Sequence, residues 1–530
     1  MKKYIIFTMT ALVLVSCGED WLDINQDPNN PQTGTLSLIL PAAQTAKAFG
    51  MTRDINKNTM VFTRQLYNLS ESQYTQDPTT YSNDYDGLFG NVLKEMEEII
   101  EQGTEQEAWN FVGIAKIMKA HTYMVMVDLW GDLPYTEALN GEETLSPEFT
   151  PAATIYDALL LLIDEGVADL AKESTLNVEG DLIYNGDLDQ WETAANTLKL
   201  RMLLNLRLVD PARATSGINA LIAEGNLISD NSDDYEFRFG GSLTPNNRHP
   251  LYQIEYVDGN KTYHMSNYFM YNLIKKEDPR LPFYIYRQGT DSELDFETTP
   301  CSNRSDCVYG LLSGTDLGEV AEGYIGRDHG DPSGIPGDNS IRATFGVYPI
   351  GGEYDDNSRN DAGQGDGGQG AGVIPYLSNT MRAFMLAEAK LTLPGMTGGQ
   401  SAEAYLEEGI RSSMEKVEDL GLSLDEDAEP MDEAAVEAYV AARLAEYAAA
   451  TDALKLNVII KEKYYAQFGN GMEAFTDLRR TGYPADLPAS LAPAAPFPLR
   501  LPYSITELNT NSNAPSPPPV LDSPVFWDVN

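Results

Sequence analysis

Cysteine, histidine and tryptophan are scarce in this chain of 530 residues, which has 3, 4 and 5 copies of them. The histidines lie far apart and form neither an H-E-x-x-H motif nor a close Cys/His cluster, so no zinc site is indicated. Neither a G-x-S-x-G turn nor a Walker A loop is present, and we expect neither catalysis nor a cofactor. A glycoside hydrolase stays open as an alternative, because 80 acidic residues are available and its carboxylate pair is defined only in space.

Basic residues are also few, with 36 Lys and Arg against 80 Asp and Glu and a formal net charge of -44. Nucleic-acid binding needs basic grooves, so a nucleic acid is excluded as a partner. Adhesion to anionic lipid through charge is excluded for the same reason. Any attachment to a membrane therefore needs a lipid anchor.

Apolar runs long enough to span a bilayer are missing, and the longest lies at the N-terminus. Lys2 and Lys3 precede an apolar stretch over 4–15, which Ser16 and Cys17 follow. This order is typical of a bacterial lipobox, with residues 1–16 as a signal peptide and Cys17 as the lipidated first residue of the mature chain. An ordinary cleaved signal peptide is the alternative. Residues 17–35, rich in Asn, Asp and Pro, are predicted to form the tether.

The two remaining cysteines, Cys301 and Cys307, are close in the sequence. An even pair in an exported protein indicates a disulfide, which here would close a small loop. Two free thiols are the alternative.

Apolar residues recur at helical spacing over most of the chain, which predicts an all-α fold with little β structure. We expect one domain over 36–530, with a helical scaffold at 36–229 and 376–484, a loop-rich insert at 230–375 and an extended C-terminal segment at 485–530. The strongest helical patterns cover Trp109–Trp130, Pro151–Leu170, Asp187–Val209, Pro211–Gly225, Thr380–Leu391, Ser401–Leu420, Asp432–Ala450 and Thr451–Phe468. Short joins between them indicate helical pairs that stack side by side, as in an α-solenoid.

Tyrosines are frequent in polar segments. A tyrosine ring offers a flat apolar face and a hydroxyl, which suits sugars and peptides, although such rings also anchor loops onto a scaffold. The predicted ligand-binding residues are Tyr74, Tyr81, Tyr85, Tyr309, Tyr324, Arg327 and His329.

Acidic residues in the insert raise the possibility of structural calcium. Asp331, Asp338 and the Asp- and Asn-rich stretch 355–366 offer the oxygen ligands that this ion takes. Their spacing does not match an EF-hand, and a solvated acidic loop is the alternative.

Several segments, taken as a set and in order, resemble the SusD/RagB family of Bacteroidetes outer-membrane lipoproteins. They are Ser16-Cys17, Leu22-Asp23-Ile24-Asn25, Asp128-Leu129-Trp130-Gly131-Asp132, Asn196-Thr197-Leu198-Lys199-Leu200-Arg201, Asp278-Pro279-Arg280-Leu281, Leu386-Ala387-Glu388-Ala389 and Asp477-Leu478-Arg479-Arg480-Thr481-Gly482. The acidic pair Glu19-Asp20 also resembles the surface-export tag of these lipoproteins.

The resemblance implies a scaffold of tetratricopeptide-like helical pairs, an outer-membrane location facing the cell exterior, and a binding protein without catalysis. It also implies a SusC-like TonB-dependent transporter as partner and an oligosaccharide ligand, with a peptide as the alternative. We expect the motif residues to determine the fold, because Arg479 and Arg480 lie beside Asp477 and Glu473 as in a partly buried ion-pair network.

Overall fold

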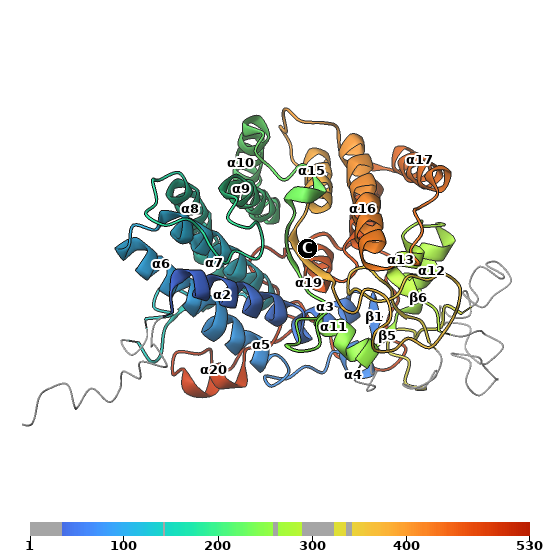
Figure 1. Cartoon of the computed structure of the whole chain (residues 1–530), viewed down its shortest axis with the longest axis horizontal. Coiled ribbons are helices and arrows are strands. Elements are labelled where there is room, and N and C mark those ends of the chain that lie inside the picture. The colour runs from blue at the N-terminus through green and yellow to red at the C-terminus, as the bar shows by residue number, and fades with distance from the viewer. Residues whose placement is uncertain (1–33, 141–143, 258–262, 289–322, 335–341, 530) are drawn as a thin grey trace, which may run out of the picture.

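The structure is a computed structural model that describes residues 34–140, 144–257, 263–288, 323–334 and 342–529 (Figure 1). The predicted signal peptide, Cys17, most of the tether, Cys301, Cys307, Tyr309 and Asp338 lie outside these ranges.

The first group of helices lies mostly in the left half of the view in Figure 1, with α3 and α4 reaching right of its centre. It comprises α2 (Leu36–Met51), α3 (Asp54–Phe62), α4 (Leu69–Ser72), α5 (Ser82–Gly87), the π-helix η2 (Leu88–Leu93), α6 (Lys94–Glu105), α7 (Trp109–Trp130), α8 (Ala152–Leu170), α9 (Leu188–Asn205) and α10 (Pro211–Glu224). Helices α7 and α8 pack closely because Gly113 and Gly166 face each other: a Cβ on Gly113 would lie 2.8 Å from the Gly166 carbonyl oxygen. The predicted helix Trp109–Trp130 is confirmed to the residue.

The second group follows the insert. It comprises α15 (Asn379–Thr392), α16 (Ala402–Leu424), α17 (Glu433–Ala449), α18 (Asp452–Ala466) and α19 (Gly471–Thr481), with a short α20 (Ile505–Thr510) in the C-terminal segment. Ser401 and Asp432, both predicted helix starts, cap α16 and α17 by accepting backbone N–H bonds. Helix α19 lies between the two groups in Figure 1 and contacts α3 and α7.

Strands are short and pair two by two, all antiparallel. The pairs are β1 (Leu66–Tyr67) with β5 (His264–Met265), β2 (Leu133–Pro134) with β3 (Phe149–Thr150), β4 (Tyr235–Arg238) with β8 (Val373–Leu377), and β6 (Ile285–Tyr286) with β7 (Thr344–Phe345). The expected all-α class with little β structure is therefore confirmed.

The insert is more ordered than its composition indicates. It holds the 3-10 helix η4 (Asn231–Asp233), α11 (Pro250–Tyr252), the π-helix η5 (Gln253–Val257), α12 (Asn267–Lys275) and α13 (Leu281–Tyr284). It also contributes to a second apolar core, in which Phe269 stacks on Phe468 at 4.8 Å and Phe345 lies 5.3 Å from the same ring. These rings hold the described backbone of the insert against α18, so its irregular segments are anchored by aromatic packing.

The motif residues meet in a buried network of charges. Glu388 on α15 accepts two bonds from Arg480 on α19 and forms an ion pair with Arg207 at 2.8 Å, and all three residues are buried. Burial alone raises the pKa of Glu388, but the two guanidinium groups lower it below its ordinary value. Arg480 also bonds Asp477 at 2.7 Å, and Asp477 bonds Lys463.

A second set of motif residues joins α7, α9 and α19. Arg201 pairs with Asp128 and, at 2.8 Å, with Glu473, while the Trp527 indole donates to Asp128 at 2.7 Å. Of the predicted ion-pair network, the pair of Arg480 with Asp477 is present, while Glu473 pairs with Arg201 and Arg479 donates to the carbonyl oxygens of Asp128 and Leu499. The observed network is buried and links α7, α9, α15, α18 and α19. These charges hold the scaffold together, in keeping with the prediction that the motif residues are fold determinants.

Candidate ligand-binding site

A groove of about 300 Å³ lies where the end of α19 meets the C-terminal segment. It is lined by Arg64, Leu478, Arg479, Pro484, Leu487, Phe497, Leu499 and Asp528. Five of these side chains are apolar and three are charged. An apolar lining with a few charged groups is the usual composition of a ligand site.

Arg64 enters this groove from the end of α3. Its backbone is left-handed, with φ 61°, and the N–H groups of Arg64 and Gln65 bond back to the carbonyls of Val61 and Met60. This is a Schellman ending, in which glycine is the favoured residue at the position that Arg64 occupies. The Arg64 side chain donates to the carbonyl oxygens of Phe62 and Pro488 and to the Tyr74 hydroxyl at 2.9 Å.

Tyr74 connects Arg64 to His329. Its hydroxyl lies 2.9 Å from both Arg64 Nη2 and His329 Nε2. A guanidinium only donates, so the hydroxyl accepts from Arg64, and its own proton is then available for a bond to His329 Nε2. Burial, with a smaller effect of Arg64, holds the pKa of His329 well below its ordinary value, so this ring is neutral at pH 7.

Phe497 forms the half-buried aromatic part of the groove. Its ring packs edge-on against Tyr74 at 5.4 Å and lies 5.9 Å from Phe475, and the Arg64 guanidinium lies 5.9 Å from its centroid. A flat ring beside a hydroxyl and a guanidinium provides both stacking and hydrogen bonding.

A polar patch adjoins this cluster. The Tyr67 hydroxyl donates to the Asp331 carbonyl oxygen at 2.5 Å, Arg327 lies over the Tyr67 ring at 5.3 Å, and His264 packs edge-on against the same ring. The bridge between Ser266 and Arg327 and the pairing of β1 with β5 bring these three chain segments together.

The structure thus brings together Tyr74 and His329, with Arg327 close to the neighbouring Tyr67. The expectation that Tyr81 and Tyr85 lie in open polar loops is wrong: each is 1% exposed, Tyr81 precedes α5, and Tyr85 packs against Trp130 at 5.3 Å. Tyr324 is also buried, as part of the second core, and the Arg287 guanidinium lies 4.8 Å from the centre of its ring. A ligand contact at any of these residues stays a prediction.

Arg64 and Phe497 escaped the sequence reasoning. Arg64 stands in an ordinary helical pattern, and Phe497 lies in a Pro-rich segment, so neither carries a local signal. Their proximity results from the C-terminal segment, in which the Leu491 N–H bonds the His329 carbonyl.

The calcium hypothesis finds no support in the described part of the chain. No group of three or more His, Cys, Asp or Glu side chains within the described ranges is arranged to hold a metal ion. The Asp331 carboxylate accepts from the Ser333 N–H at 2.9 Å and from its hydroxyl at 3.0 Å, which is a local turn.

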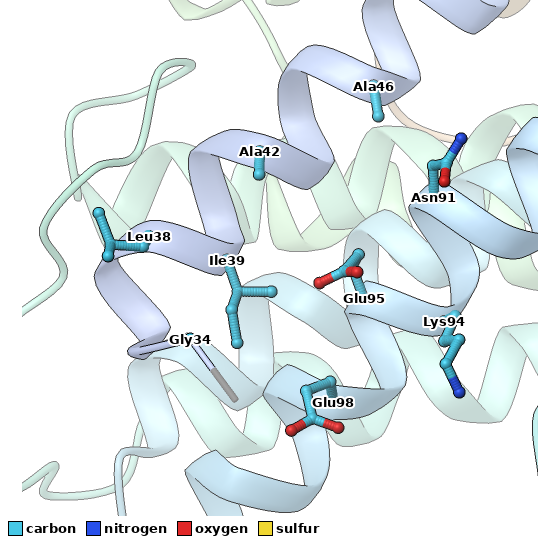
Figure 2. A pocket seen from close by; sticks show the side chains of 9 residues that line it. All are labelled: Gly34, Leu38, Ile39, Ala42, Ala46, Asn91, Lys94, Glu95 and Glu98. Carbon is cyan, nitrogen blue, oxygen red and sulfur yellow. The ribbon is translucent and has the colours of Figure 1, made fainter. Parts of the chain in front are cut away.

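A larger groove of about 530 Å³ lies between α2 and the η2–α6 segment (Figure 2). Its wall on α2 is formed by Leu38, Ile39, Ala42 and Ala46, and its opposite wall by Asn91, Lys94, Glu95 and Glu98. None of the nine residues that line it is aromatic. It therefore lacks the ring that makes the Arg64 groove suited to a sugar.

Within the described ranges, no helix has both the length and the apolar character that crossing a bilayer requires.

Two family models match the sequence. One, described as "Starch-binding associating with outer membrane", matches residues 28–301, and the other, described as "Susd and RagB outer membrane lipoprotein", matches residues 373–515. A search of curated protein sequences gives no match.

Solved structures share the fold at low sequence identity. A chitin-binding protein is 22% identical with a TM-score of 0.71, over 94% of this chain and 100% of the other. A SusD/RagB family protein from Bacteroides thetaiotaomicron is 19% identical with a TM-score of 0.72 over the same shares. A chitin-binding SusD homolog from Flavobacterium johnsoniae is 18% identical with a TM-score of 0.64, over 93% of this chain and 97% of the other.

Proposed function

The chain belongs to the SusD/RagB family of outer membrane lipoproteins, and from that premise we propose that it captures an oligosaccharide in the groove beside Arg64 and Phe497 without catalysing a reaction. Phe497 carries the proposal. It is a half-buried ring in a groove, with hydrogen-bonding groups at its edge. A sugar presents an apolar face and a rim of hydroxyls, which matches this combination.

Two further observations support a glycan ligand. The fold is shared with proteins whose names state that they bind chitin. The groove is flanked by buried tyrosine, histidine and arginine side chains that are held by one another, so little ordering is needed when a ligand binds.

We also propose that the protein is lipidated at Cys17 and delivers its ligand to a SusC-like TonB-dependent transporter at the cell exterior. The predicted tether, residues 17–35, would separate the lipid from α2, which begins at Leu36.

Isothermal calorimetry with chitin, starch and xylan oligosaccharides and with a peptide mixture tests the proposal. We expect binding of at least one glycan, a loss of about tenfold or more in affinity for Phe497→Ala, and no released product. Trp109→Ala is the control, because it also removes a half-buried aromatic ring but far from the groove. Trp109 begins α7, about 30 Å along the helix from Asp128 at the end of α7 that α19 contacts.

Three results would count against the proposal. Binding of peptides alone would show that the ligand is a peptide and not an oligosaccharide. Turnover of a glycan would make the protein an enzyme. Equal affinities for Phe497→Ala and the unmodified protein would move the site elsewhere.

A further inference from the structure

Arg64 is a buried cation without a carboxylate partner. Its side chain is 6% exposed, and every acceptor that it bonds is neutral: two carbonyl oxygens and the Tyr74 hydroxyl. Within the described part of the chain no acidic group forms an ion pair with it, whereas Arg201, Arg280 and Arg480, which are also buried, each pair with at least one acid. Lys47, Arg248 and Arg500 are likewise buried without an ion pair among the described residues, but none of these three lines the groove. Its charge is therefore uncompensated at the edge of the groove.

We propose that the groove takes an acidic oligosaccharide, with Arg64 attracting the carboxylate of a uronic acid unit while Phe497 packs against the sugar ring. This inference rests on the proposed function and specifies its substrate class. A buried charge is costly unless it is paired. An ion pair between Arg64 and a ligand carboxylate therefore contributes more to the binding free energy here than it would at the surface.

The charge of the groove contrasts with the charge of the chain. Two arginines and one aspartate line it, in a protein of formal net charge -44. Asp528 acts on Arg479, since its charge partly offsets the lowering of the Arg479 pKa by burial. No carboxylate acts on Arg64 in the same way, and its pKa is lowered chiefly by burial. The groove is thus a local positive region on an acidic molecule, which favours an anion.

The backbone indicates that the Arg64 side chain is needed where it is. Arg64 and its partner Tyr74 have left-handed conformations, with φ of 61° and 58°. A non-glycine residue in this region costs on the order of 1 kcal/mol, and such costs concentrate at functional sites. Both positions follow a helix end where glycine would serve the turn equally well.

The guanidinium retains capacity for a ligand. One bond leaves from Nε, one from Nη1 and two from Nη2, so one N–H on Nη1 has no acceptor among the described residues. A charge-assisted bond from it to a carboxylate is stronger than a bond to a neutral hydroxyl. This difference provides a basis for discriminating acidic from neutral sugars.

Calorimetry with tetragalacturonic acid and with its carboxyl-reduced neutral form tests the inference. We expect the acidic form to bind about tenfold or more tightly at low salt. We expect the difference to shrink as salt is raised to about 0.5 M, because screening weakens the attraction between the groove and the carboxylates of the ligand. The neutral form should show little salt dependence.

Variants of Arg64 complete the test. Arg64→Gln should lose about tenfold in affinity for the acidic form and less than twofold for the neutral form, and Arg64→Lys should retain most of the preference. Arg411→Gln, which removes an exposed arginine paired with Glu407 and Glu437, is the control. Because Arg64→Gln also weakens bonds to the C-terminal segment, the salt dependence of the unmodified protein provides an independent readout.

Equal binding of the two forms, or binding of neutral glycans only, overturns the inference and leaves glycan capture intact. Binding of acidic peptides but of no glycan overturns both. A preference for the acidic form that Arg64→Gln does not reduce, in a variant with an unchanged unfolding midpoint, also overturns the role of Arg64.

Discussion

Tyr74 and His329 stand 255 positions apart, and their hydroxyl and Nε2 atoms lie 2.9 Å from each other. Tyr74→Phe leaves His329 Nε2 and an Arg64 N–H without this partner, and an unpaired buried polar group costs roughly 1–3 kcal/mol. We expect this loss in the free energy of unfolding, together with weaker glycan binding. Denaturant unfolding and calorimetry measure the two effects. Tyr376→Phe is the matched control, since the buried Tyr376 hydroxyl has no bonding partner in the described structure; equal destabilisation of both variants would contradict the role of the bond.

Glu388 is predicted to be essential for stability. It is 0% exposed and neutralises both Arg480 and Arg207. Glu388→Gln leaves two buried cations without this partner, and we expect a loss of about 3–5 kcal/mol in the free energy of unfolding. Urea unfolding provides the measurement. Glu437→Gln, which removes an exposed partner of Arg411, should cost less than about 1 kcal/mol.

Asp84 is predicted to make stability depend on pH. Its carboxylate is 1% exposed and caps α3 through the Ile55 N–H at 3.1 Å; burial, followed by the nearby charge of Asp54, raises its pKa to about 7. An acid with a raised pKa destabilises the folded state as pH rises from its ordinary value near 4 through about 7. We expect Asp84→Asn to be more stable than the unmodified protein by about 1–3 kcal/mol at pH 8 and equally stable at pH 4. Thermal unfolding of both proteins at both pH values tests this prediction. If Asp84→Asn is less stable than the unmodified protein at pH 8, the ionised carboxylate stabilises the fold and the prediction is wrong.

Tyr81 is predicted to matter for stability and not for ligand contact. Its ring is 1% exposed, and its hydroxyl accepts a bond from Asn58 Nδ2 at 3.3 Å. Tyr81→Ala should cost about 3–5 kcal/mol, as large-to-small changes in a core do, while Tyr81→Phe should cost about 1 kcal/mol or less. Unfolding midpoints test this, and a fully stable Tyr81→Ala variant with reduced ligand affinity would restore the ring to the binding site.

Cys17 is predicted to carry the anchor. Cys17→Ala removes the residue that the lipid would modify, so we expect a folded protein that leaves the membrane fraction and still binds its ligand. Fractionation of cells and calorimetry on the released protein are the measurements. Retention of Cys17→Ala in the membrane would mean that another contact holds the protein there.

The helical scaffold follows from local sequence. Apolar spacing over Trp109–Trp130 and capping residues such as Ser401 and Asp432 act within a few positions, so the helix bounds were predictable. The motif that contains Arg479 and Arg480 indicated an ion-pair network because Asp477 is near in the sequence, whereas the second partner of Arg480, Glu388, is 92 positions away. The family resemblance also predicted the class of protein, an outer-membrane binding lipoprotein.

The ligand site depends on contacts between distant segments. Arg64, His329 and Phe497 have no local pattern that links them, and their meeting depends on how the C-terminal segment packs across the ends of α3 and α19. The sequence also did not predict which tyrosines are near the groove. Tyr81 and Tyr74 stand in similar polar surroundings in the sequence, but only Tyr74 contacts Arg64, His329 and Phe497. The sequence by itself determined the helices, the acidic surface and the predicted lipid anchor, because these depend on spacing and composition. Only the tertiary structure decided that Arg64 lines the groove without an acidic partner among the described residues, because ion pairing is set by distances between residues far apart in the chain.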